Sequence, residues 1–377
     1  MHAVHINFVS DPLRRPPSEL LHAWWALVDI AEAPTTSGVR VSVVVAAAAR
    51  DTLTQNNVTY HFLPAAAAPF DTRLRPALAE LLNALDPDVL HVHGLGFTRH
   101  IAALAELMPH VPIVLQDHAD RLPRFWRRGA WRRAAASAAG VLFCTEEQAT
   151  PFKRANLLKS DVPIHAIPES TSRFTLGEQA GARSSTGIYG APCVLWVGHL
   201  NRNKDPLTVL DGVSLVARQL PDLHLWCCYG NAPLLRAVSD RVSRDPALTD
   251  RVHLLGKVTH DDIQALMRAA DMFVLGSHRE GSGFSLIEAL ACGLVPVVTD
   301  IPSFRSLTGD GTIGRLWQCG NASQLASALL AMAGTASPNR RMLIRSHFDR
   351  HLSMAAVGRR LASAYRQSID RHRARAG

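Results

Sequence analysis

Residues 272–298 read MFVLGSHREGSGFSLIEALACGLVPVV, and their pattern indicates the fold class of the chain. The apolar run Met272–Leu275 predicts a short buried strand, and Val295–Val298 predicts a second one. Between them, a glycine-containing loop leads into a helix that we expect to begin near Ser285 and to stop at Gly293. A strand, a helix and a second strand in this order form a βαβ unit, which requires a parallel sheet.

The same alternation of short apolar runs and helix-period segments extends over most of the chain. Further strands are predicted at Val4–Val9, Arg40–Val45, Val89–His93, Pro112–Leu115, Gly140–Cys144, Cys193–Val197, His224–Tyr229 and Val252–Leu255. Helices are predicted at Leu20–Ala31, Pro76–Leu85 and Arg99–Leu107. This order indicates an α/β protein whose parallel sheets are covered by helices.

The length of 377 residues exceeds that of one ordinary domain. The segment Pro168–Ser185 is rich in Ser, Thr and Gly and predicts a linker, with a boundary near residue 175. We therefore expect one Rossmann-like domain at 1–174, a second at 175–350, and a C-terminal helix at 351–377 that packs back on the first domain. Two doubly wound domains would face each other across a cleft at the carboxyl edges of their sheets, where such sheets bind ligands.

Composition excludes several classes of protein. With 47% hydrophobic and 19% charged residues, the chain has too much apolar material and too little charge for a disordered protein. No apolar run approaches the roughly 18 residues of a membrane-spanning helix. The N-terminal MHAVHINFVS lacks a secretion signal, so we expect a cytoplasmic protein. Six cysteines without a C-x-x-C pair predict reduced thiols rather than disulfides or a zinc site.

Two glutamates flank the glycine loop of the opening stretch. Glu280 precedes the loop, and Glu288 lies eight positions further on, inside the helix. A helix N-terminus behind a glycine loop binds anions, and a carboxylate accepts two hydrogen bonds from the vicinal hydroxyls of a ribose or hexose. The alternative is an acidic first turn favoured by the helix dipole, with Glu280 in solvent.

A second strand–loop–helix segment carries basic residues. Its strand ends at Gly198, and the helix that follows begins with Asp205 as N-cap. The loop between them carries His199, Arg202 and Lys204, the last being one of only four lysines in the chain. Cations beside a helix N-terminus can neutralise a diphosphate without a metal ion. The alternative is an ordinary solvated turn.

Together these segments resemble the family 4 glycosyltransferases, retaining enzymes with two facing Rossmann-like domains (the GT-B fold). The matching motifs are Glu-x7-Glu at Glu280/Glu288 with EALACGLVPVVTD from Glu288, V-G-(R/H)-L-x-x-x-K at Val197–Lys204, PDVLHVHG at Pro87–Gly94, the dipeptide His118–Ala119, and YGNAPLL at Tyr229–Leu235. The similarity preserves their order and spans nearly the whole chain.

The resemblance implies a role for each matching residue on the donor side. Glu288 would hold the ribose of the donor nucleotide, and Lys204 would bind its diphosphate. Glu280 would contact the transferred sugar, together with the backbone N–H groups of Ser282, Gly283 and Phe284. In the first domain, the catalytic His118 would approach the donor sugar, and Asp117 beside it is a candidate on the acceptor side.

This chain departs from the family pattern at two places. The family arginine directly after Gly198 is here His199, and a neutral imidazole donates one hydrogen bond where guanidinium gives two and a permanent charge. Arg202, three residues on, is a candidate replacement. The glycine pair that many relatives have after the first strand is also absent. The segment there carries Arg14 and Arg15, which either bind an acidic acceptor or lie in solvent.

Two patterns resemble metal sites, and we predict none at either. His91 and His93 point to one face of a strand, but a histidine pair without a nearby third ligand is seldom a metal site. Asp86-x-Asp88 precedes a strand with Pro87 between the acids, and it predicts a turn.

The net charge of +8 favours anionic partners. Residues Arg121–Arg133, RLPRFWRRGAWRR, combine six arginines with Phe125, Trp126 and Trp131. Three interpretations are open: peripheral contact with the inner membrane face for a lipid-linked acceptor, a nucleic-acid patch, or a solvated helix whose tryptophans enter the core.

The prediction is therefore a retaining, metal-independent glycosyltransferase without a cofactor, using a UDP-, GDP- or ADP-sugar and an unidentified acceptor (a glycan, a lipid-linked molecule or a small molecule). Fixed cations and helix-end amides would stabilise the charge on the leaving diphosphate. As the family implies, that diphosphate would help to deprotonate the acceptor. The alternatives are a sugar-nucleotide epimerase or phosphorylase-like enzyme of the same fold, and a basic nucleic-acid-binding protein, for which no recognisable reading module is present.

Overall fold

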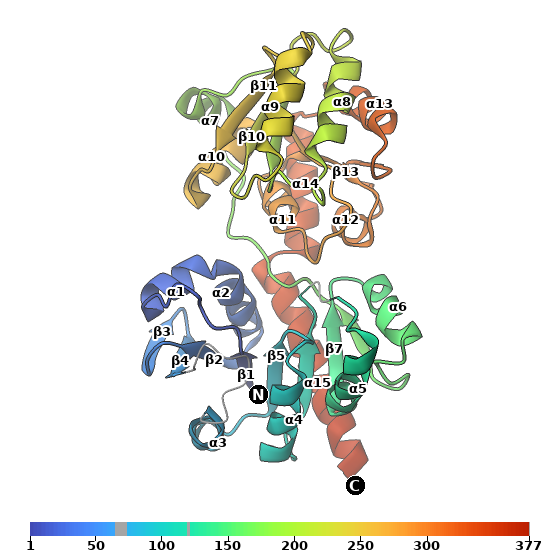
Figure 1. The fold of residues 1–377 in the computed structure, drawn as a ribbon. Helices are drawn as coiled ribbons and strands as arrows, with labels where there is room; N and C mark the ends of the chain where they lie inside the picture. Colours follow the sequence, from blue (N-terminus) through green and yellow to red (C-terminus); the bar gives the residue numbers. More distant parts are fainter. Residues whose placement is uncertain (65–73, 119–120, 377) are drawn as a thin grey trace. The chain divides into compact units, whose positions relative to one another are not determined.

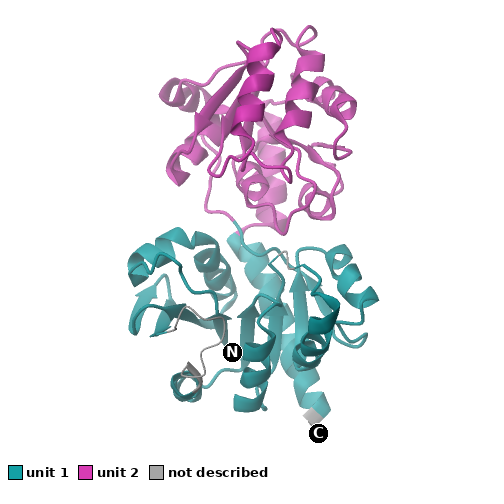
Figure 2. Ribbon diagram, in the orientation of Figure 1, with its two compact units in different colours: residues 1–171, 354–377 teal, residues 172–353 magenta. Residues whose placement is uncertain are grey.

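The computed structural model describes residues 1–64, 74–118 and 121–376, and these group into two compact units (Figure 2). Unit 1 contains residues 1–171 and 354–377, and unit 2 contains residues 172–353. Ala119, which belongs to the His-Ala motif of the sequence analysis, lies outside the described residues.

Unit 1 is built on an eight-stranded sheet with the order β3-β4-β2-β1-β5-β6-β7-β8 (Figure 1). The strands are β1 (His2–Asn7), β2 (Arg40–Ala47), β3 (Asp51–Gln55), β4 (Val58–Pro64), β5 (Val89–His93), β6 (Ile113–Gln116), β7 (Ala138–Phe143) and β8 (Ile164–Ala166). Every neighbouring pair is parallel except the hairpin of β3 and β4.

Helices cover both faces of this sheet. They are α1 (Pro17–Ala23), α2 (Trp25–Glu32), η1 (Ala33–Ser37), α3 (Leu74–Leu85), α4 (Thr98–Leu107), η2 (Phe125–Arg127), α5 (Arg128–Ala136), α6 (Glu146–Arg154) and α15 (Met354–Ala376). Side chains alternate along β1, so Ala3 packs with α1, α2 and α15, whereas Val4 and Ile6 pack with α3 to α6 on the opposite face. The C-terminal α15 thus closes the core of unit 1 on one face (Figure 1).

Unit 2 has a six-stranded, fully parallel sheet with the order β11-β10-β9-β12-β13-β14. Its strands are β9 (Cys193–Val197), β10 (His224–Cys228), β11 (Val252–Gly256), β12 (Met272–Leu275), β13 (Val295–Thr299) and β14 (Arg315–Trp317). Its helices are α7 (Gln179–Thr186), α8 (Pro206–Val216), α9 (Leu235–Arg244), α10 (His260–Ala269), α11 (Phe284–Ala291), α12 (Pro302–Thr308), α13 (Ala322–Met332) and α14 (Pro338–His351). Leu286, Ile287 and Leu290 of α11 are fully buried in a single apolar core.

The βαβ unit predicted at residues 272–298 is present as β12, α11 and β13, and α11 is followed by Gly293 in the left-handed conformation (φ 75°). Other expectations need correction. The predicted linker is partly helical, because Gln179 and Arg183 of α7 bond to Asp271 and so fix this segment on unit 2. The predicted helix at residues 20–31 is two helices, because Trp24 leaves the helical region (ψ 42°).

Candidate active site

The loop between β12 and α11 packs against the loop between β9 and α8. His278 donates its backbone N–H to Asn203 O (2.8 Å), and the Asn203 side chain donates to Arg279 O (2.9 Å). Gly276 allows this approach, because a Cβ there would lie 3.0 Å from the backbone oxygens of Lys204 and Asp205. The two loops that the sequence analysis singled out, one basic and one glycine-rich, therefore lie side by side at the carboxyl ends of the neighbouring central strands β9 and β12.

Lys204 and Glu280 meet where these loops join. Lys204 Nζ donates to Glu280 Oε1 at 2.6 Å, and the two side chains are only 15% and 12% exposed. Asn201 holds the lysine backbone through its side-chain oxygen (3.0 Å). A short, largely buried ion pair of this kind is much less screened by water than a surface pair.

The start of α11 is shaped by Gly283. This residue is the N-cap and adopts φ 72°, and a Cβ on it would lie 2.7 Å from the Phe304 ring. Only glycine fits both the left-handed backbone and the close contact. Ser282 beside it is buried, and Phe284 is the first helical residue. Glu280 precedes the N-cap of α11 by three residues, and the helix dipole favours negative charge at this end of the helix.

Glu288 projects from the second turn of α11 and is almost fully buried. Its Oε1 lies 2.7 Å from Nε2 of His260, the first residue of α10. The His260 ring packs on Phe174, with 4.7 Å between ring centroids. His260 was not predicted as a site residue, because its contact with Glu288 joins residues 28 positions apart.

His199, which stands where the family has arginine, and Arg202, its candidate replacement, lie in different surroundings. His199 Nδ1 accepts a hydrogen bond from the backbone N–H of Asn231 (3.2 Å), so a neutral His199 carries its proton on Nε2. Arg202 is exposed and makes no ion pair within the part of the chain that the structure describes. Gly198 lies against Leu275 and the aliphatic part of Lys204. Asp205 is the α8 N-cap, as predicted.

In unit 1, His118 follows β6 and borders a cavity of about 360 Å³. The cavity is lined by Asn7, Val9, Leu27, His93, Gly94, Phe97 and His118. His118 Nδ1 lies 2.9 Å from Glu169 Oε2, and its Nε2 lies 3.1 Å from Nδ1 of His93. Both ring nitrogens are therefore engaged, and the side chain remains 36% exposed.

The remaining acceptor-side candidates are held locally. Asp117 is buried, and its backbone N–H bonds to Leu142 O (2.9 Å). Arg15 forms an ion pair with Asp11 at 3.6 Å, whereas Arg14 is exposed and has φ 51°. Of the two arginines, Arg14 is the one that faces solvent.

The two tryptophans of the arginine-rich segment Arg121–Arg133 differ in their exposure to solvent. Trp131 of α5 stacks on Phe152 of α6, with 5.9 Å between the ring centroids, at the edge of the core. Phe125 and Trp126 of η2 are 76% and 61% exposed and pack edge to face, and Arg124 lies over the Trp126 ring. Of the three interpretations of this segment, the one in which both tryptophans enter the core therefore fits Trp131 and does not fit Trp126.

The two patterns that resemble metal sites, Asp86-x-Asp88 and the pair His91 and His93, differ in their surroundings. Asp86 adopts the left-handed conformation (φ 47°) directly after α3, and Asp88, one residue before β5, accepts the backbone N–H of His2 (2.7 Å). His91 and His93 do have a third histidine nearby, since His5 of the neighbouring strand completes a buried group whose ligand atoms lie within 4.8 Å of one another. The premise that no third ligand is close was therefore wrong.

Two units, each built on a mainly parallel sheet with flanking helices, form an α/β fold of the GT-B class. The fold is similar to that of Anabaena HepE, solved in complex with UDP, with a TM-score of 0.70, 17% identity, and coverage of 96% of this chain and 99% of that one. It is also similar to a glycosyltransferase from Rickettsia africae, with a TM-score of 0.75, 10% identity and 98% coverage of both chains.

The family follows from sequence comparison. The model described as Glycosyltransferase Family 4 matches residues 25–168, and the one described as Glycosyl transferases group 1 matches residues 191–334. GDP-mannose:cellobiosyl-diphosphopolyprenol alpha-mannosyltransferase of Xanthomonas campestris is 25% identical over 301 residues, covering 75% of this chain and 76% of that protein. Mannosylfructose-phosphate synthase of Agrobacterium fabrum is 35% identical over 147 residues, covering 36% of this chain and 32% of that protein.

The chain belongs to the family 4 glycosyltransferases. It is a glycosyltransferase of the GT-B type that uses a nucleotide sugar, and the predicted fold class and family are confirmed. Among the described helices, none has both the length and the apolar character needed to span a bilayer.

Proposed function

We propose that this enzyme transfers a hexose with retention of anomeric configuration and without a metal ion, from a nucleoside-diphosphate sugar held on unit 2. The observation that carries the proposal is the contact of Lys204 with Glu280 at the start of α11. In the donor complex, Lys204 would bind the diphosphate, Glu280 the transferred sugar, and Glu288 the ribose. His118 of unit 1 would contact the transferred sugar during turnover.

Charge explains why this set of residues suits glycosyl transfer. Breaking the sugar–phosphate bond places negative charge on the leaving diphosphate and positive charge on the anomeric carbon. A lysine and the N-terminal amides of α11 stabilise the first charge in place of a metal ion. The leaving phosphate oxygen would take the acceptor proton on the same face of the sugar, which gives retention.

The donor is identified by thermal-shift screening of the full chain against UDP, GDP, ADP and their sugars. The Xanthomonas relative is named for GDP-mannose and Anabaena HepE was solved with UDP, so both bases belong in the screen. We expect one nucleotide to stabilise the protein in the presence of EDTA. Stabilisation that requires a divalent cation would contradict metal independence, and an inverted product anomer, measured by NMR, would contradict retention.

We also propose a lipid-linked acceptor in polysaccharide biosynthesis, reached at a membrane surface. Exposed aromatic side chains beside arginines are typical of surfaces that bind anionic lipid headgroups, and Phe125 and Trp126 with Arg124 and Arg127 form such a surface on η2. The Xanthomonas relative is named for a diphosphopolyprenol acceptor.

The epimerase alternative is separated by one incubation. With the donor sugar alone, an epimerase produces a new sugar nucleotide, whereas a transferase gives at most slow hydrolysis. Formation of an epimer without acceptor would replace the present proposal.

A further inference from the structure

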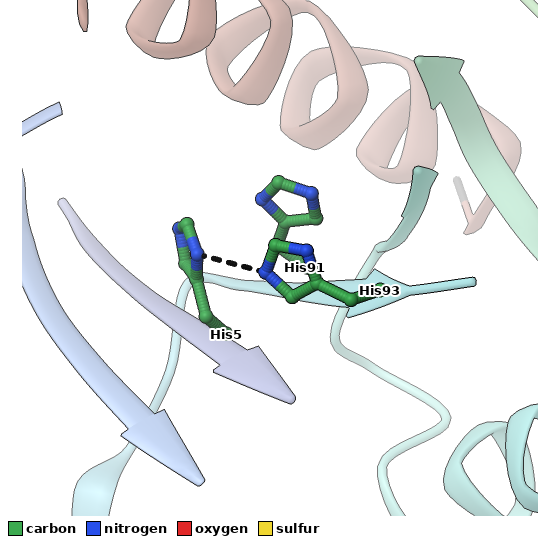
Figure 3. Close-up of side chains that lie close together, drawn as sticks. All are labelled: His5, His91 and His93. Atoms are coloured by element: carbon green, nitrogen blue, oxygen red, sulfur yellow. Dashed lines mark hydrogen bonds between the residues drawn. The ribbon is translucent and has the colours of Figure 1, made fainter. Parts of the chain in front are cut away.

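A chain of hydrogen bonds runs through the core of unit 1 beneath His118. His5 of β1 and His91 of β5 are register partners, and His93 lies two positions further along β5 on the same face (Figure 3). All three are buried between the sheet and α15, where Tyr365 is also buried. The lack of solvent lowers the pKa of each histidine well below the usual value, so the rings are neutral at pH 7.

The chain joins six side chains through five contacts. These are Glu169 Oε2 to His118 Nδ1 (2.9 Å), His118 Nε2 to His93 Nδ1 (3.1 Å), His93 Nε2 to His5 Nδ1 (3.2 Å), His5 Nε2 to Tyr365 OH (2.9 Å), and Tyr365 OH to His91 Nδ1 (2.8 Å). Two members of this hydrogen-bond chain, His118 and His93, line the 360 Å³ cavity. Three other members, His5, His91 and Tyr365 of α15, lie buried where α15 covers the sheet. Figure 3 shows the central contact between His5 and His93.

The carboxylate of Glu169 sets the direction of every bond. An ionised carboxylate only accepts, so His118 carries its proton on Nδ1, and the Nε2 of neutral His118 must accept. His93 therefore donates from Nδ1 and accepts at Nε2, and the same reasoning places the His5 proton on Nδ1. Tyr365 then donates to His5 Nε2 and accepts from His91 Nδ1.

The far end of the chain agrees with this assignment. His91 Nε2 would be left as a lone pair, and it is buried and makes no hydrogen bond of normal geometry, although the Gln116 side chain lies close to His91 and His93. The other five ring nitrogens of His5, His91 and His93 all form a hydrogen bond. Three neutral imidazoles can also ligate a metal ion. Here, however, five of their six ring nitrogens already form hydrogen bonds to one another, to His118 or to Tyr365, and a metal ion would have to break these bonds.

We propose that His93, His5 and Tyr365 are positioning residues for His118, and that with Glu169 they form a one-way hydrogen-bond chain that holds His118 as the neutral Nδ1–H tautomer. This inference rests on the proposed function, which places His118 at the transferred sugar. Through Tyr365, the C-terminal helix α15 thereby becomes part of the support of the catalytic side chain.

The direct test is spectroscopic and needs no substrate. In the full-length protein labelled with ¹⁵N-histidine, long-range ¹H–¹⁵N spectra at pH 7.5 distinguish an N–H from a lone-pair nitrogen, with assignment by single-histidine variants. We expect His5, His91, His93 and His118 all to be Nδ1–H tautomers. An Nε2–H tautomer at His93 or His5 would overturn the chain. So would one equivalent of bound Zn²⁺ that shifts the signals of His5, His91 and His93 together.

Kinetics test the positioning role with a matched pair of variants. His93→Gln keeps an amide that can donate to His118 and accept from His5, whereas His93→Leu can do neither. For His93→Leu we expect kcat to fall about tenfold to a hundredfold with donor KM unchanged, because the variant changes only the position of the His118 side chain. His93→Gln should recover most of the loss. Equal kcat values for the two variants would contradict positioning by this chain.

Tyr365→Phe provides a second variant, since it keeps the ring and removes only the hydroxyl. We expect a smaller fall in kcat and loss of the single tautomer at His5; an unchanged His5 tautomer would count against the chain. The proposed function fails separately. If the tautomers are as stated but His118→Ala leaves turnover intact, the chain stands and the role of His118 is wrong.

Discussion

Lys204 and Glu280 form a 2.6 Å ion pair across two loops of unit 2, and both side chains are largely buried. In the proposed mechanism, Lys204 binds the diphosphate and Glu280 contacts the sugar. Lys204 Nζ has three N–H donors and gives one to Glu280, so a phosphate oxygen of the donor would share the ammonium with this carboxylate or displace it. The pair keeps the lysine oriented and its charge compensated while the site holds no donor.

Lys204→Ala should weaken binding of the nucleoside diphosphate by about 1–3 kcal/mol, the range for one charge-assisted hydrogen bond. Isothermal titration calorimetry would then give a Kd about fivefold to 150-fold higher. The matched control is Lys257→Ala, which removes the same charge from an exposed position of the same unit and should leave the Kd unchanged. Equal Kd values for the two variants would place the diphosphate elsewhere.

Glu280→Gln and Glu288→Gln should have opposite signatures. Glu280→Gln removes the carboxylate that competes with the diphosphate for Lys204, so affinity for the nucleoside diphosphate should be equal or higher while kcat falls. Glu288→Gln removes the proposed ribose ligand, so affinity should fall by about tenfold, in the range for a hydrogen bond to a charged group. Calorimetry and initial rates measure both quantities. If the two variants lose affinity equally, Glu280 binds the nucleotide rather than the sugar.

Much of the site could be predicted from sequence because its signals are local. The strand, glycine turn and helix around Gly283, and the N-cap at Asp205, depend on residues a few positions apart. The resemblance of both motifs to one family then indicated that the loops carrying Lys204 and Glu280 belong to the same site. Local patterns of this kind are the most reliable part of a sequence-based prediction.

The missed parts depend on contacts between distant residues. His5 joins the pair of His91 and His93 only because β1 lies beside β5 in that register, across 86 positions of the chain. His260 reaches Glu288 from another helix. Strands β3, β4, β8 and β14 were not predicted. In β3 the residues are mostly polar and exposed, and β8 and β14 have three residues each, too few to show a period.

The buried histidines should make the stability of the protein fall in acid. Their folded-state pKa values are lowered by burial, so the unfolded chain binds more protons below its own histidine pKa of about 6.5. Their contribution is therefore complete above about pH 6.5 and is lost as the pH falls toward the lowered values. Each histidine that takes up a proton on unfolding adds about 1.4 kcal/mol per pH unit to the slope.

Urea denaturation of the full chain between pH 8 and pH 5 measures this dependence. His91→Gln should reduce the slope of unfolding free energy against pH below pH 6.5 by the amount for about one proton. His91 suits this test because it lies at the far end of the hydrogen-bond chain. If the wild-type free energy of unfolding instead increases as the pH is lowered from 6.5 to 5, these rings are charged in the folded protein.

The exposed aromatic side chains of η2 should contribute to membrane binding. Trp126→Ala should reduce co-sedimentation with vesicles of anionic phospholipid, because the indole is 61% exposed beside arginines. Tyr189→Ala, which removes a half-exposed aromatic ring from unit 2, is the control and should have no effect. Charge reversal at Arg127, Arg128, Arg132 and Arg133 should abolish binding at low salt. If it leaves both vesicle binding and activity intact, the membrane surface is not here.

Arg341 should be a stabilising residue of unit 2 although it lies far in sequence from the site. Its guanidinium is almost fully buried and donates to the backbone oxygens of Ala270 (2.8 Å), Arg268 (3.0 Å) and Cys292 (3.0 Å). Cys292 is the C-cap of α11, so this arginine caps the helix whose other end carries the proposed donor site. Arg341→Met fills similar space but leaves these carbonyls without their donor. At about 1–3 kcal/mol for each unsatisfied buried group, we expect a loss of about 3 kcal/mol or more in the free energy of unfolding, measured in urea. Arg350→Met is the matched control, because Arg350 is an exposed arginine of the same helix and should change stability by less than about 0.5 kcal/mol. Similar losses for both variants would mean that the carbonyls at the end of α11 are satisfied by water, and that the buried guanidinium contributes no more than a surface charge.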